Sequence, residues 1–466
     1  MKKSFGPTQI LILVGLLTLI LAPRPTAGAL DLMAAERFNA AGDQAEAAQA
    51  YETAAVRIPW MPWLWEQAGL MAMESGRVEK AISLFNLAAE HNALTASGWL
   101  VLGRAYQEQG NISKAINAWK QALPLARADS YLAAAERSEG DFSEAIAYWQ
   151  ANITMEPESA AAHYALGLLL AATAPGQANP ELIKAADLCS ALDAQVESLR
   201  TALNTAFLSD DRGYQFLVSG QALGALGEWD LATEAFRNAT IARPNYGEAW
   251  AWLAQAEQQQ GQDGSLEIKQ ALTYSPGSAM VQGLYGMFLQ RQGKPADALA
   301  PFQKAADLEP DNPAWQMALG SASEQTGDLV TAYGYYIQAV ELAPADASTW
   351  KALVTFSVTN SVDVESTGLP AARRLVGLVA DDWQSFDLAG EAEFSLGNDS
   401  AAAVYLKKAV EKGPTEAAPA LHLGLVDLQT GDRTSAYTYL NLAKTFDPDG
   451  IIGWQARRLL EQYFPQ

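Results

Sequence analysis

This sequence has few of the residues from which disulfides, metal sites and phosphate-binding surfaces are built. Of its 466 residues one is cysteine (Cys189) and three are histidine (His91, His163 and His422). A single cysteine forms no intramolecular disulfide, and so few scattered ligands nearly exclude a Cys/His zinc site. Lysine and arginine total 31 against 53 aspartates and glutamates, so the net charge is −22. Because nucleic-acid binding needs concentrated positive charge, the composition disfavours a nucleic-acid partner.

Catalytic and nucleotide-binding motifs are also missing. The sequence contains no Gly-x-Gly-x-x-Gly, no P-loop, no His-Glu-x-x-His and no calcium-loop pattern. Apolar residues still make up 49% of the chain, which is enough to bury a core and fold. We therefore expect a folded protein that is not an enzyme and that has neither a cofactor nor a metal.

The first residues have the composition of a targeting segment. Lysines at positions 2 and 3 precede an apolar run over residues 10–22, and Ala-Gly-Ala follows at 27–29. This order is typical of a secretory signal. As a helix the run would span about 20 Å, short of the ~30 Å hydrocarbon core, although residues 5–22 could just span it. Residues 1–29 are thus either a cleaved signal, the favoured alternative, with Leu30 as the mature N-terminus, or an N-terminal membrane anchor. Both alternatives predict an extracytoplasmic body that is periplasmic, on the cell surface or secreted.

The rest of the chain repeats with a period of about 34 residues. Glycines recur where helical patterns break, and most neighbouring glycines are 34 residues apart or nearly so. They are Gly42, Gly76, Gly110, Gly140, Gly227, Gly261, Gly293, Gly327, Gly397 and Gly431. Apolar residues fall at helical spacing on both sides of each glycine, which predicts two helices per unit. Neither helix can bury its apolar face alone, so the units must stack on their neighbours.

Other residue types recur at fixed offsets from these glycines. The third unit reads Trp99-x2-Leu102-Gly103-x2-Tyr106, then Gly110, then Ala115-x3-Trp119-x2-Ala122. This pattern resembles the tetratricopeptide repeat (TPR). The resemblance implies an all-α, right-handed superhelical solenoid of about twelve helix-turn-helix units over residues 30–448, with a C-terminal capping helix within 449–466. Irregular units are expected near 160–212, with an extra helix near 192–207, and near 347–382, with a loop over 359–369.

The thirteen tryptophans suggest a sugar-binding surface at first, but most share repeat positions. Trp65, Trp99, Trp250 and Trp350 occupy one such position, which predicts a place in the core. Trp60, Trp63 and Trp252 are less clearly core residues. Because glycan binding needs a row of exposed aromatics, the shared positions argue against it.

In proteins of the TPR family the first helices of successive units line a groove that holds peptides or partner helices. The helical period places residues 13, 10, 6, 3 and 2 before each turn glycine on one stripe. Near the middle of the chain this stripe is rich in amides, which pair with peptide backbones, and in adaptable methionine. The predicted partner-binding residues are Tyr214, Gln221, Gln255, Gln258, Gln259, Met287, Gln290, Arg291 and Glu324. The alternative is an ordinary solvated face.

A second candidate on the same stripe is basic. Arg104, Arg127 and Arg137 lie in the third and fourth units and could bind a carboxylate or an acidic partner segment. The alternative is that they are solvated arginines with little energetic effect. The stripe lacks the lysine and asparagine combination of chaperone-docking members of the family, which disfavours that role.

Together these features predict a non-catalytic protein–protein interaction scaffold of the bacterial cell envelope. Its partners would be other proteins, and it would touch a membrane only through an uncleaved N-terminal segment. The alternative is an accessory repeat module that presents substrates to a separate envelope glycosyltransferase or polysaccharide export system.

Overall fold

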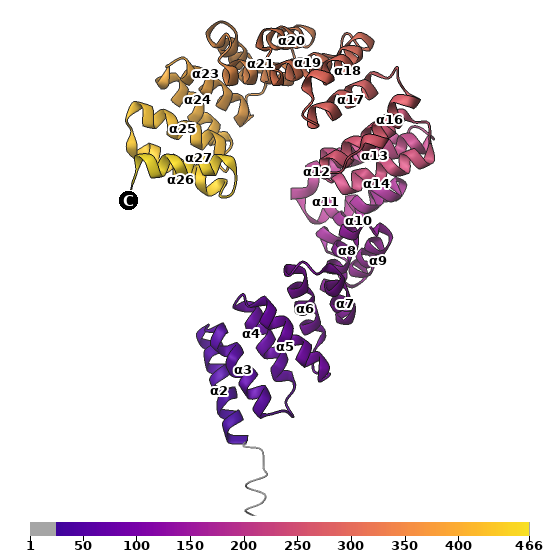
Figure 1. The fold of residues 1–466 in the computed structure, drawn as a ribbon, viewed down its shortest axis with the longest axis vertical. Helices are drawn as coiled ribbons and strands as arrows, with labels where there is room; N and C mark the ends of the chain where they lie inside the picture. The colour runs from indigo at the N-terminus through magenta and orange to yellow at the C-terminus, as the bar shows by residue number, and fades with distance from the viewer. Residues whose placement is uncertain (1–24, 466) are drawn as a thin grey trace, which may run out of the picture. The chain divides into compact units, whose positions relative to one another are not determined.

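The computed structural model describes residues 25–465, which form helices and no strands (Figure 1). The expected all-α class is thereby confirmed for this range. Most of the predicted signal or anchor segment lies outside the described residues. The described residues divide into two compact bodies, with the boundary between residues 238 and 239. No helix of residues 25–465 is long and apolar enough to cross a membrane.

Antiparallel helix pairs make up the N-terminal body. The first four pairs are α2 (Pro25–Ala41) with α3 (Gln44–Arg57), α4 (Trp63–Glu74) with α5 (Val78–Glu90), α6 (Ala96–Glu108) with α7 (Ile112–Ala122), and α8 (Ala126–Glu139) with α9 (Phe142–Met155). The fifth pair is α10 (Ala160–Thr173) with α11 (Ala178–Leu188), joined by the 3-10 turn η1 (Pro175–Gln177). The sixth is α13 (Arg212–Ala225) with α14 (Trp229–Ala242), whose last residues cross the boundary between the bodies.

The C-terminal body continues the same arrangement. Its pairs are α15 (Gly247–Gln259) with α16 (Ser265–Tyr274), α17 (Ala279–Arg291) with α18 (Pro295–Leu308), α19 (Pro313–Gln325) with α20 (Leu329–Leu342), α21 (Ala347–Asn360) with α22 (Leu369–Leu378), α23 (Trp383–Ser395) with α24 (Asp399–Lys412), and α25 (Ala417–Thr430) with α26 (Arg433–Phe446). The helix α27 (Ile451–Tyr463) follows and packs on α26. Residues 25–465 thus form twelve pairs, as the sequence predicts.

The turn inside most pairs depends on glycine. All ten glycines that define the sequence period have a positive φ, between 72° and 85°. This left-handed backbone region costs glycine little because it has no Cβ. The period of the sequence is therefore the period of the left-handed turns.

A second glycine in many pairs lets the two helices approach each other. A Cβ built on Gly286 of α17 would lie 2.5 Å from Cε1 of Phe302 on α18, and Phe302 is fully buried. The same contact recurs between Gly103 and Trp119. Packed interiors leave no room for such an added atom, so these glycines fix the spacing within the pair.

The two irregular units differ from the others in distinct ways. In the fifth, η2 (Ser190–Leu192) and an additional helix, α12 (Asp193–Ala206), follow α11. In the tenth, the expected loop over residues 359–369 is wrong in part, because residues Val364–Gly368 form the π-helical turn η3. The amides of Thr367 and Gly368 both donate to the carbonyl of Asp363, at 2.8 and 3.0 Å. These bonds satisfy backbone groups that a loop would leave to water.

Candidate functional site

The predicted groove residues lie on the first helices of four successive pairs, α13, α15, α17 and α19. In the C-terminal body Gln259 is exposed, whereas Gln258, Met287 and Gln290 are partly buried. Tyr214 and Gln221 of the N-terminal body are also partly buried. In each body, therefore, most of the stripe residues named here are partly buried.

Gln255 differs from what the sequence predicts for a ligand contact. Its side chain is buried, with 4% of its surface exposed. Its Oε1 accepts a hydrogen bond of 2.5 Å from Nη1 of Arg291 on the next first helix. Burial lowers the pKa of Arg291 below its ordinary value. Gln255 therefore positions the Arg291 guanidinium at the surface instead of facing a partner itself.

Glu324 also has its partners within the protein. Its two carboxylate oxygens accept hydrogen bonds from the Tyr336 hydroxyl at 3.0 Å and from Nδ2 of Asn360 at 2.6 Å. Burial, together with the charge of Glu324, raises the pKa of Tyr336. The carboxylate thus links α19 to its own second helix and to the first helix of the next pair.

Two other amides of the stripe have atoms without a partner. Oε1 of Gln258 and Nε2 of Gln290 are both buried and form no hydrogen bond with any described residue. The other end of Gln258 is held, because its Nε2 donates to the carbonyl of Phe288 at 3.3 Å. A buried polar atom left unpaired costs roughly 1–3 kcal/mol. Adjacent helices α15 and α17 therefore carry one unused acceptor and one unused donor.

The predicted basic spot loses one of its members. Arg137 of α8 forms a bidentate pair with Asp230 of α14, with Nε–Oδ2 and Nη2–Oδ1 both 2.7 Å, and also contacts Glu228. Although burial opposes the shift, the hydrogen bonds from Arg137 lower the pKa of Asp230. Arg104 and Arg127 are exposed and form no ion pair with a described residue. The basic spot therefore has two exposed arginines without an ion pair among the described residues, where the sequence predicts three.

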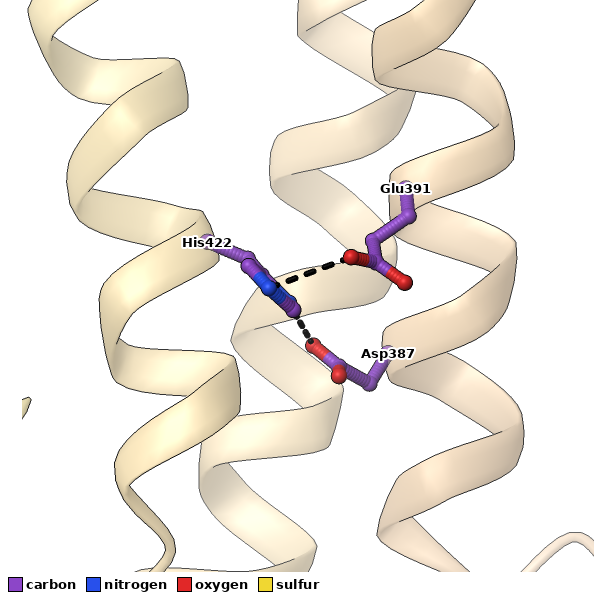
Figure 2. Close-up of side chains that lie close together, drawn as sticks. All are labelled: Asp387, Glu391 and His422. Atoms are coloured by element: carbon purple, nitrogen blue, oxygen red, sulfur yellow. Dashed lines mark hydrogen bonds and ion pairs between the residues drawn. The ribbon is translucent and has the colours of Figure 1, made fainter. Parts of the chain in front are cut away.

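The C-terminal pairs bring together three side chains that sequence reasoning did not select. Asp387 and Glu391 lie one turn apart on α23, and His422 lies opposite them on α25 (Figure 2). Nδ1 of His422 is 2.9 Å from Oδ1 of Asp387, and its Nε2 is 3.1 Å from Oε1 of Glu391. A carboxylate only accepts, so when both acids are ionised both ring nitrogens donate and the ring is an imidazolium. Burial raises the pKa of Glu391, against the lowering effect of the His422 charge. Burial alone would lower the pKa of His422, but the hydrogen bond and charge of Asp387 and the charge of Glu391 raise it.

These three residues are of types that can ligate a metal, and one ligand atom from each lies within 4.8 Å of the others. Both ring nitrogens, however, are already engaged by the two carboxylates. The arrangement is that of a histidine ring which joins two successive first helices by bridging two carboxyl groups. The sequence predicts no metal site, and the predicted stripe residues lie in the middle of the chain and in the third and fourth units. Asp387 and Glu391 stand 10 and 6 residues before Gly397, so the same rule applied to this pair finds both.

Comparisons with known proteins agree with the fold. A family model described as tetratricopeptide repeat matches residues 66–133, 125–194, 217–264 and 287–347, which together are just over half of the chain. No curated protein matches the sequence.

Solved structures with a similar fold include yeast Tom70, with 14% identity and a TM-score of 0.44 over 94% of this chain and 95% of that one. The Cut9–Hcn1 hetero-tetramer of the APC/C gives 14% identity and a TM-score of 0.40 over 95% and 98%. PilF of Pseudomonas aeruginosa gives 16% identity and a TM-score of 0.38 over 47% of this chain and 99% of that chain.

Proposed function

From the premise that this chain belongs to the tetratricopeptide repeat family, we propose that it is a scaffold of the bacterial cell envelope that binds partner segments along its first helices. Repeats of this family are protein–protein interaction modules and are generally non-catalytic, so a role as an interaction scaffold follows from membership. The envelope location rests on the two N-terminal lysines, the apolar run and the small residues that follow it.

The main support for a binding surface on α15 and α17 is that Gln258 and Gln290 each have an unpaired buried amide atom. An extended peptide offers alternating donors and acceptors along its backbone, which a buried amide acceptor on α15 and an amide donor on α17 can both use. Binding in this way requires the two side chains to turn so that these atoms reach the surface. Pairing them recovers the free energy that the unbound protein loses by leaving them unsatisfied. Met287 lies about one turn before Gln290 on α17 and suits varied apolar side chains.

Affinity capture with the full chain from its own envelope extract, followed by titration of the captured partner, tests this proposal. The double variant Gln258→Ala with Gln290→Ala should bind more weakly by about 1–3 kcal/mol, since each net hydrogen bond contributes about 0.5–1.5 kcal/mol. Gln303→Ala is the matched control, because Gln303 is an exposed glutamine on the second helix α18. Added salt should change the affinity little, because the lost contacts carry no charge.

Two outcomes would contradict the proposed surface. Equal affinity of the double variant and the control would exclude the amides of α15 and α17. Weaker binding of Arg104→Ala with Arg127→Ala, mimicked by added salt, would move the site to the two exposed arginines of the N-terminal body.

A further inference from the structure

The start of α2 and the connection between α3 and α4 lie together at the beginning of the array. Nη1 of Arg57, the last residue of α3, is 2.7 Å from Oδ2 of Asp31 on α2. Gly28 is packed so closely that a Cβ on it would lie 2.3 Å from Cγ1 of Ile58. These contacts bring residues 27–35 and 54–65 together, and we call their exposed side the N-terminal edge.

This edge exposes large apolar side chains. Leu30, Met33 and Val56 are 66%, 56% and 65% exposed, and Trp60 and Trp63 are 52% and 44% exposed. Exposed apolar side chains gathered at one edge are of the kind that marks an interaction site.

The connection that carries the tryptophans is held in place from the inside. Met61 packs against the hydrophobic core of the first pairs. The amide of Met61 donates to the carbonyl of Ile58 at 3.0 Å, and the amide of Leu64 donates to that of Met61 at 3.1 Å. Pro59 and Pro62 restrict the backbone further, because each fixes φ. Since Met61 occupies the inward position, Trp60 and Trp63 are left on the outside.

The charge of the edge is unlike that of the chain. The protein has a net charge of −22, but the edge contains only one acid, Asp31, and one base, Arg57. These two residues are paired with each other. Three connections of later pairs each hold two acids and no base of their own: Glu156 with Glu158, Glu309 with Asp311, and Asp381 with Asp382. Glu158 and Asp381 pair with lysines of neighbouring helices, and the connections over residues 123–125 and 275–278 carry no charge. The N-terminal edge is therefore a neutral surface on an acidic molecule.

The described chain begins at Pro25, and in the sequence the apolar run ends three residues earlier, at Ala22. Three residues of chain reach at most about 11 Å, whatever their conformation. The predicted cleavage between Ala29 and Leu30 falls inside α2, so it would remove the first helical turn together with the packed Gly28.

We propose that the N-terminal edge rests on the surface of a lipid bilayer, with Trp60 and Trp63 in the headgroup region and residues 1–24 retained as the anchor. This inference rests on the envelope location proposed above and adds which surface meets the lipid. Tryptophan favours the membrane interface because its ring is apolar and its N–H can still find a polar partner. A neutral edge can approach lipid phosphates, whereas the acidic connections of later pairs would be repelled by anionic lipids.

Fluorescent labels on the full chain in phosphatidylcholine vesicles test this orientation. Cys189→Ser removes the only native thiol, and Leu30→Cys then places one environment-sensitive label on the edge without removing either tryptophan. The matched control is Asp43→Cys, an exposed residue at the opposite end of α2 and α3 that makes no side-chain cap bond. The label at 30 should shift to the blue and be quenched by lipids with a headgroup-proximal nitroxide, and the label at 43 should do neither.

A second pair of variants separates the edge from the anchor. Trp60→Ser with Trp63→Ser should reduce quenching of the label at 30 while the chain stays bound to vesicles through residues 1–24. Unchanged quenching, or equal emission from labels 30 and 43, would overturn the proposal. So would a membrane-bound product whose intact mass begins at Leu30, or a blue shift that depends on protein concentration and not on lipid, which would indicate a second copy on the edge. None of these outcomes changes the affinity of the stripe for its partner, so the two proposals fail separately.

Discussion

Replacing Gly286 by alanine should separate packing from helix propensity within this array. The added Cβ would lie 2.5, 2.6 and 2.7 Å from three ring carbons of Phe302, which is fully buried and cannot turn toward solvent. Overpacking of this kind costs about 1–3 kcal/mol. Alanine also favours the helix by about 1 kcal/mol over glycine, which offsets part of that cost.

Gly334→Ala is the control that isolates the packing contribution. Gly334 lies inside α20, and a Cβ built on it meets nothing within 4 Å. Both substitutions gain the same helix propensity, so the difference between their effects on the free energy of local unfolding reports the packing cost alone. This difference should be about 1–3 kcal/mol, and Gly334→Ala itself should be neutral or stabilising. Hydrogen exchange is the suitable assay, because repeat arrays unfold locally and a single unfolding free energy is not defined for them. Loss of protection should concentrate in α17, α18 and their neighbours. Equal stabilisation by both substitutions, or uniform loosening of the whole chain, would refute the reasoning.

Two further predictions concern the charged clusters. Because the pKa of His422 is raised in the folded protein, the stability that it contributes is complete below its unfolded pKa of about 6.5 and should be lost as pH rises through the higher folded value. Hydrogen exchange of α23 and α25, corrected for intrinsic rates, should show less protection at pH 9 than at pH 6. His422→Gln should abolish this difference. A wild-type profile that matches the variant would contradict the ion-paired imidazolium. Arg137→Met should weaken α8 and the first turns of α14 by about 1–3 kcal/mol, since the pair is partly buried and its loss leaves Asp230 uncompensated. Arg137→Lys should restore only part of that protection, because lysine lacks the bidentate fork, and full restoration would show that charge alone matters.

Much of the fold follows from local chemistry that a sequence displays. The left-handed turns need glycine, and the close contacts need a small residue opposite a ring, so both leave a regular trace such as Gly286, Gly293 and Phe302. The π-helical turn η3 leaves no such trace, because it depends on which amides reach the carbonyl of Asp363 in three dimensions. Periodicity therefore predicts the regular pairs, and the added length of the fifth unit predicts the extra helix α12, but neither predicts η3.

The helical period predicts which residues share a stripe of the surface, but not which side chains pair across it. The period places Gln255, Gln258 and Gln290 on one stripe, but it does not say that Arg291 reaches back to occupy Gln255. It likewise gives no sign that Arg137 meets Asp230, 93 residues away, across the irregular fifth unit. Pairing between side chains of different helices depends on the exact stacking of the pairs, which a single sequence does not encode at fixed offsets.

The binding surface itself is most directly tested by photo-crosslinking in the native envelope. A benzophenone side chain would replace Gln290 on the stripe of α17 and, separately, Gln303 on α18, both in the full chain. Partner binding along the first helices predicts a discrete protein adduct from position 290 that position 303 does not give. Adducts of equal yield from the two positions, or from position 303 alone, would contradict a partner that binds along the first helices.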